Sequence, residues 1–169
     1  KKLLNTRIQV GAQNCHESQN YGASTGYINS SMLKSVGAKY VILGHSENRQ
    51  SGETDKLINL KIKAAIKSGL KVIFCIGETL TQKRKKITKK ILSRQISTGL
   101  KKIKNKKNII IAYEPVWSIG TGLIPKSDDL YETVNFIKKK MRKNKVLYGG
   151  SVNPKNINDL KSINNIDGY

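Results

Sequence analysis

Glu114 is the residue of this sequence whose type and setting most directly indicate chemistry. It comes after a β-branched run at residues 109–111, which predicts a strand buried on both faces. Pro115 disfavours a helical backbone at Glu114, and a loop with one tryptophan and two glycines follows. A carboxylate at a strand end under such a loop is suited to act as a general base that is shielded from water. A solvated Glu in an ordinary strand-to-helix connection is the alternative interpretation.

The elements that must position Glu114 alternate between strands and helices. Apolar runs predict strands at residues 8–11, 40–44, 72–76, 109–112 and 146–148, with a sixth, incomplete strand at 166–169. Apolar residues at helical spacing predict helices at 54–68 and 81–104, and Ser127 is expected to be the N-cap of a third. Such alternation is typical of a parallel α/β sheet, in which ligands bind at the carboxyl ends of the strands.

Polar or glycine-rich clusters follow the predicted strands, where those carboxyl ends would lie. The clusters are Gln13-Asn14, His45-Ser46-Glu47, Gly77-Glu78-Thr79, Glu114 with its loop, and Gly149-Gly150-Ser151. Ser46 and Glu47 are suited to open a short helix behind His45. Glu78 is expected to cap or pair with a neighbouring group rather than to do chemistry.

The composition bounds the class of protein. A chain of 169 residues is long enough for one domain with a sizeable core. Cys15 and Cys75 lack the spacing of a metal site or a disulfide framework, so we expect a reduced, cytoplasmic protein without a metal. The apolar runs fall well short of the roughly 20 residues that a membrane helix needs, and we see no secretory signal.

The net charge of +21 raises a basic nucleic-acid-binding module as an alternative function. Most of the excess is lysine on the predicted outer faces of helices, as at residues 83–90 and 138–143, and aromatic residues make up only 6% of the chain. Base stacking needs rings beside the charge, so we expect a solvated lysine-rich surface and no nucleic-acid partner. The same charge attracts anionic small molecules.

Five motifs, in this order and at these separations, resemble the triosephosphate isomerases. They are Gly11-Ala12-Gln13-Asn14, Val41-Ile42-Leu43-Gly44-His45-Ser46-Glu47, Cys75-Ile76-Gly77-Glu78-Thr79, Tyr113-Glu114-Pro115-Val116-Trp117 and Tyr148-Gly149-Gly150-Ser151. The resemblance covers essentially the whole chain and implies an α/β fold, the (β/α)8 TIM barrel. Residues 1–169 would form a single partial barrel domain, from the third strand to the start of the eighth, lacking the first two βα units and the C-terminal end.

The resemblance also implies a reaction. The family interconverts dihydroxyacetone phosphate and D-glyceraldehyde 3-phosphate by proton transfer through an enediolate, in glycolysis and gluconeogenesis. It needs no cofactor and acts as a cytoplasmic homodimer. Glu114 resembles the general base, and His45 resembles the electrophile that polarises the carbonyl oxygens. This family is the reference case for a neutral imidazole at a helix N-terminus. Without the other motifs, a core histidine with a satisfied hydrogen bond would be favoured for His45.

Further residues resemble supporting parts of that site. Glu47 resembles an acid that supports the geometry around His45, while Gly120 and Ser151 resemble contacts of the substrate phosphate. The loop after Glu114 resembles a lid that closes over the substrate. Its residues are Pro115, Val116, Trp117, Ser118, Ile119, Gly120, Thr121 and Gly122.

Several features depart from the family pattern. The family's Asn and Lys at the end of the first strand, and its Gly pair after the eighth, have no counterpart here, and loss of the Lys would weaken oxyanion stabilisation. Residues 21–27 resemble the loop that enters the partner subunit, with Thr25 at its tip. Tyr27 replaces an acid and Asn48 a base that would meet across that interface. A truncated, inactive remnant is therefore the alternative, and we expect the chain alone to isomerise little or nothing.

Overall fold

The computed structural model describes residues 6–169 and shows one parallel sheet. Its five strands lie in the order β1-β2-β3-β4-β5, so each strand pairs with its neighbour in the sequence. The strands are β1 (Gly11–Ala12), β2 (Tyr40–Leu43), β3 (Lys71–Ile76), β4 (Ile109–Tyr113) and β5 (Val146–Tyr148). Because every pair is parallel, the carboxyl ends of the strands share one edge of the sheet, as the sequence predicts.

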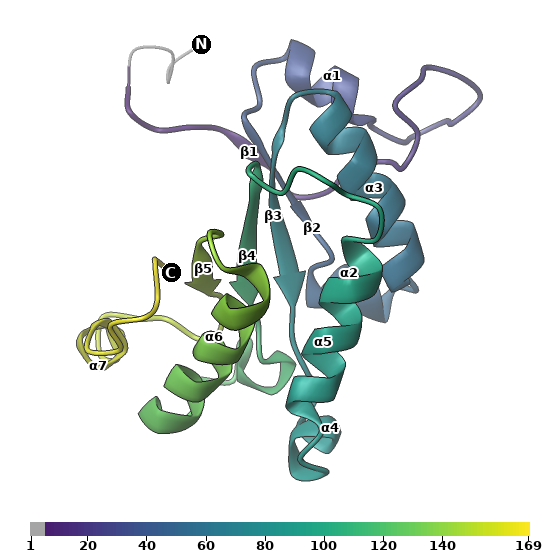
Figure 1. The fold of residues 1–169 in the computed structure, drawn as a ribbon. Coiled ribbons are helices and arrows are strands. Elements are labelled where there is room, and N and C mark those ends of the chain that lie inside the picture. The colour runs from purple at the N-terminus through teal and green to yellow at the C-terminus, as the bar shows by residue number, and fades with distance from the viewer. Residues whose placement is uncertain (1–5) are drawn as a thin grey trace.

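Helices connect the strands and flank the sheet (Figure 1). The longest are α3 (Asp55–Lys67), α5 (Thr88–Gly99) and α6 (Ser127–Met141), and α3 packs beside α5. The shorter ones are α1 (Ser30–Ser35), α2 (Ser46–Gln50), α4 (Leu80–Arg84), the 3-10 helix η1 (Val116–Ser118) and α7 (Ile157–Lys161). Within residues 6–169, no helix has the length and apolar character that crossing a membrane requires.

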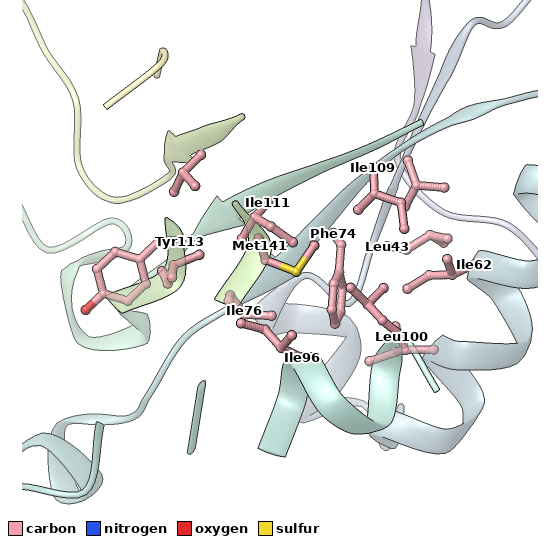
Figure 2. Packing of buried hydrophobic residues seen from close by; sticks show 14 of the residues in the cluster. Leu43, Ile62, Phe74, Ile76, Ile96, Leu100, Ile109, Ile111, Tyr113 and Met141 are labelled. Atoms are coloured by element: carbon pink, nitrogen blue, oxygen red, sulfur yellow. The ribbon is translucent and has the colours of Figure 1, made fainter. Parts of the chain in front are cut away.

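The hydrophobic core lies between the sheet and these helices. Alternate strand residues point into it, among them Leu43, Phe74 and Ile111, which have no exposed surface. Figure 2 shows Phe74 among residues of the strands and of α5. Gly99 of α5 makes this contact possible, because a Cβ there would lie 2.5 Å from the Phe74 ring. Ile110 points to the other face and is partly exposed, so the expectation that residues 109–111 are buried on both faces holds fully only for Ile109 and Ile111.

The structure divides the helix that the sequence predicts at residues 81–104. Helix α4 ends at Arg84 and α5 begins at Thr88, with Lys86 at a φ of 56° between them. A left-handed residue interrupts the helical hydrogen bonds, whereas the apolar spacing continues across the break and conceals it. Ser127 is likewise not an N-cap: it is the first residue of α6, and the N-cap is Lys126.

The two edges of the sheet are shorter than predicted. Residues 8–10 precede β1, and Ile8 and Val10 are 63% and 48% exposed. Residues 166–169 contribute a single bridge, between Leu147 and Gly168, rather than a strand. Within residues 6–169, strand β1 lies at the edge of the sheet and pairs with β2 alone. The backbone N–H and C=O groups on its other side therefore have no neighbouring strand to bond to.

Candidate active site

Glu114 lies at the carboxyl end of β4, where the backbones of the neighbouring strands come unusually close. Its carboxylate is buried, with 7% of the residue exposed. Gly77, just after β3, leaves room for the Glu114 backbone, because a Cβ at Gly77 would lie 1.8 Å from the Glu114 carbonyl oxygen. Gly149, just after β5, leaves room for the side chain, because a Cβ there would lie 2.8 Å from Glu114 Cγ. Two glycines from adjacent strand ends thus define the position of Glu114.

Burial raises the pKa of the Glu114 carboxyl above its ordinary value. Hydrogen bonds from the Cys75 thiol and the Ser46 backbone N–H lower the pKa in part, because they favour the charged carboxylate, and a positive charge on His45 would act in the same direction. A carboxylate with a raised pKa is a stronger base than one in water, and its pKa lies closer to neutral pH, which favours general-base catalysis. Sequence analysis did not single out Cys75 as a neighbour of Glu114; the apolar run around Cys75 predicts only a strand.

His45 is the N-cap of α2 and faces Glu114. Its Nδ1 accepts a hydrogen bond from the Glu47 backbone N–H at 3.4 Å, and its Nε2 lies 3.8 Å from Glu114 Oε1. This hydrogen bond favours the tautomer of a neutral ring in which Nε2 carries the proton, on the side of Glu114. The prediction that Ser46 and Glu47 open a short helix is confirmed by α2.

Arg49 fixes the start of α2 against two strand ends, a role that the sequence analysis missed. Its guanidinium donates to the Gly44 carbonyl at 2.7 Å and to the Cys75 carbonyl at 3.1 Å, and it pairs with Asp55 at 2.6 Å. Gly44 precedes His45 in the chain, and Cys75 neighbours Glu114 in the structure. The Arg49 side chain therefore links the backbone beside His45 to the backbone beside Glu114. An Arg four residues after a strand-end His is the only signal in the sequence for this contact.

The segment at residues 115–122, which the sequence predicts to be a lid, is attached at both ends in the structure. At its start, Trp117 in η1 donates from Nε1 to Glu78 Oε1 at 3.0 Å. At its far end, the Gly122 N–H donates to Ser151 Oγ at 3.1 Å. Ser118 contributes a third contact, between its hydroxyl and that of Tyr148 at 2.9 Å.

Glu78 makes the structural contacts that the sequence predicts for it. It is 1% exposed and accepts from both the Tyr113 hydroxyl and the Trp117 indole. Burial raises the pKa of Glu78, and its hydrogen bonds and the Lys83 ammonium lower it in part.

The structure does not bring every predicted site residue to Glu114. Glu47 has a side chain that is 82% exposed, with Oε2 at 3.7 Å from His45 Nδ1, so it borders His45 from the solvent side. Gly120 is exposed at the tip of the lid, with a φ of 68°. Ser151 accepts a hydrogen bond from the Gly122 N–H. Thr25 is exposed in the loop at residues 21–27.

A cleft opens beside His45 at the same edge of the sheet. Its volume is ≈ 350 Å³, which is within the range of small-molecule sites. The lining residues are Gln13, Asn14, Ile42, His45, Glu47 and Asn48.

Comparison with known proteins decides the family. The family model described as triosephosphate isomerase matches residues 1–169. The chain belongs to the triosephosphate isomerase family. A triosephosphate isomerase of Thermodesulfovibrio yellowstonii is 44% identical over 177 residues, covering 99% of this chain and 72% of that protein. One of Carboxydothermus hydrogenoformans is 46% identical over 178 residues, covering 98% of this chain and 70% of that protein.

A solved structure agrees with these relatives. The crystal structure of triosephosphate isomerase from Bartonella henselae matches with a TM-score of 0.89 at 39% identity, covering 99% of this chain and 72% of that one. The predictions of the family and of triosephosphate isomerase function are therefore confirmed. The fold prediction is confirmed too: the sheet of five parallel strands is an incomplete TIM barrel. The inactive remnant is not better supported by these matches.

Proposed function

We propose that Glu114 and His45 carry out the proton transfers by which this triosephosphate isomerase interconverts dihydroxyacetone phosphate and D-glyceraldehyde 3-phosphate. One observation carries the assignment: a buried carboxylate and an imidazole Nε2 face each other at 3.8 Å at the carboxyl edge of the sheet. Groups this close reach neighbouring atoms of one small substrate, which is what proton transfer between adjacent carbons requires.

The steps follow from the positions of the two groups. Glu114 removes the proton from the carbon beside the carbonyl, and the electron pair of that C–H bond moves to form the enediolate. His45 donates a hydrogen bond from Nε2–H to the oxygen on which negative charge develops. His45 moves the hydroxyl proton of the first carbon to the oxyanion of the neighbouring carbon. The C=O double bond then forms on the first carbon while Glu114 returns its proton to the neighbouring carbon, so no proton is gained or lost overall. Burial supports the first step, because it raises the pKa of Glu114 and makes the carboxylate a better base.

The lid and its contacts support assignments for the phosphate. Gly120 has the left-handed backbone of an exposed glycine turn, in which amides are available to an anion. Ser151 follows two glycines at the end of β5 and holds Gly122 of the lid. We assign Gly120 and Ser151 as phosphate contacts and Glu47 as a residue that supports His45. The lid protects the enediolate from water.

The assembly and location of the enzyme are part of the same proposal. We expect a cytoplasmic homodimer, with residues 1–169 as one partial barrel domain and Thr25 entering the partner subunit. The Tyr27 ring contacts the ring of His16 in the same chain, with ring centroids at 4.8 Å. This contact supports the altered interface that is expected at Tyr27 and Asn48. We expect neither nucleic acid nor a membrane as partner.

A coupled isomerase assay tests the proposal on this chain joined to the remaining barrel segments of a relative, such as the triosephosphate isomerase of Thermodesulfovibrio yellowstonii. Turnover that disappears in Glu114→Gln supports the assignment of the base, whereas turnover that survives the substitution removes Glu114 from its role. The same assay decides between the enzyme and the inactive remnant: we expect the unaccompanied chain to show little turnover, and a rate within about tenfold of typical enzyme turnover, itself about 10 per second, would contradict that.

A further inference from the structure

Trp117 of the lid is held on its face as well as on its edge. Lys83, in the last turn of α4, places its Nζ 3.8 Å from the centroid of the Trp117 ring. The indole edge is held separately, because Nε1 donates to Glu78. A cation over the face of tryptophan is attracted by the negative face of the ring, and tryptophan is the aromatic residue that binds cations best.

The position of Lys83 is itself fixed by the fold. Helix α4 begins with a reciprocal capping box between Thr79 and Gln82, which orients the helix directly after Glu78. The Lys83 ammonium also lies 3.9 Å from Asp129 of α6, and its side chain is 34% exposed. Glu78 and Lys83 thus approach Trp117 from a single segment, one on the ring edge and one on the ring face.

The distance at Lys83 distinguishes it from the other lysines that lie over rings. Lys71 over Tyr40, Lys89 over Phe136 and Lys140 over Phe136 lie at 5.4, 5.9 and 5.3 Å from the ring centroids. Lys83 is closer by more than an ångström, and its partner ring belongs to the segment after Glu114 rather than to the sheet or one of the long helices.

We propose that Lys83 is a positioning residue of the lid, whose ammonium holds the Trp117 ring by a cation–π contact and so favours the attached conformation of the lid over released ones. Trp117 is three residues after Glu114, so the same contact limits how far the start of the lid can move from the base. The lid's purpose rests on the proposed function, but the contact does not, and it can be measured on the chain without substrate.

Trp117 is the only tryptophan of the sequence, so a fluorinated tryptophan labels this position alone. Chains carrying 5-fluoro-, 5,6-difluoro- or 5,6,7-trifluorotryptophan are prepared, and the 19F signal of the shared 5-fluorine gives the ratio of released to attached indole. Each added fluorine withdraws charge from the ring face and weakens its attraction for a cation. With Lys83 in place, we expect this ratio to rise along the series by about two- to fivefold in total.

Three variants isolate the ammonium. Lys83→Met keeps a long side chain but removes its charge. In the chain with 5-fluorotryptophan, we expect this substitution to raise the ratio of released to attached indole about two- to fivefold. We also expect the ratio to stop changing as further fluorines are added. Lys83→Arg keeps a cation over the ring and is expected to restore both. Lys89→Met, on the neighbouring helix α5, removes a distant ring contact and is the matched control, expected to leave the ratio unchanged.

A ratio that does not change with fluorination, or that changes equally with Lys83 and with Met at this position, overturns the proposal. So does a single attached signal in every variant. If Lys83→Met does not fold, the fluorine series with Lys83 in place decides by itself. A negative isomerase assay leaves all of these measurements intact, so failure of the proposed function is distinguishable from failure of this inference.

Discussion

Gly149→Ala is expected to displace the proposed base without removing any functional group. The new Cβ would lie 2.8 Å from Glu114 Cγ, whereas ordinary contacts of a Cβ begin at 3.4 Å. The Glu114 side chain must therefore move by roughly 0.6 Å or more. A misplacement of about 1 Å in catalytic geometry costs about 100-fold in rate. The backbone at Gly149 does not itself require glycine, since its φ is not positive.

The same substitution has a cost in stability. Overpacking of a filled site costs roughly 1–3 kcal/mol, and replacing glycine with alanine offsets about 0.4–1 kcal/mol of this through the unfolded chain. We expect a net loss of about 1–2 kcal/mol in the free energy of unfolding, seen as a Tm lower by about 2–8 °C.

Steady-state isomerase kinetics, measured on this chain joined to the remaining barrel segments of a relative, and thermal unfolding measure the two effects. We expect kcat to fall by about 10- to 100-fold while KM changes by less than about threefold, because Gly149 is not assigned to the phosphate. Gly168→Ala is the matched control: its Cβ would meet the flexible end of Leu147 at 3.1 Å, and we expect kcat to be unchanged. A Gly149→Ala variant with normal kcat and normal Tm would refute the argument that Gly149 makes room for Glu114.

Three further predictions concern the base and the lid. Glu114→Asp withdraws the carboxylate by about 1.5 Å and is expected to lower kcat by about 100-fold with little change in KM; equal turnover would contradict the role of Glu114. Because burial raises the pKa of Glu114, the folded chain keeps this proton to a higher pH than the unfolded chain. The stabilising effect of Glu114 is thus complete below about pH 4.3 and is lost as the pH rises through the folded-state pKa. In urea titrations, Glu114→Gln should therefore be more stable than the unsubstituted chain at pH 7 and no more stable at pH 4; a gain at pH 4 equal to that at pH 7 would show that the carboxylate is not the cause. Ser151→Ala removes the acceptor of the Gly122 N–H, and exchange of that amide with deuterium should speed up about fivefold, with an unchanged rate arguing against this attachment of the lid.

Sequence alone was sufficient for the alternation of strands and long helices and for the sheet edge at which the proposed site residues lie. The runs at residues 40–44, 72–76 and 109–112 are short and apolar, and the segments between them carry apolar residues at helical spacing. Local patterns of this kind are visible without tertiary information. His45 and Glu114 come shortly after two of these runs. They could be assigned to one edge of the sheet because parallel strands have their carboxyl ends at the same edge. The break at Lys86 was not predictable in this way, since it alters backbone conformation without altering the apolar spacing.

Contacts between segments distant in the sequence were decided only by the tertiary structure. Cys75 and Arg49 carry no local signal for their contacts near Glu114, and the pKa of Glu114 is raised by burial that many segments create together. The room that Gly77 and Gly149 leave depends on how closely β3, β4 and β5 approach one another. Residue types and spacing thus determined which chemistry this chain carries, because they are local properties. Distances, burial and the attachment of the lid depend on packing, which only the folded chain defines.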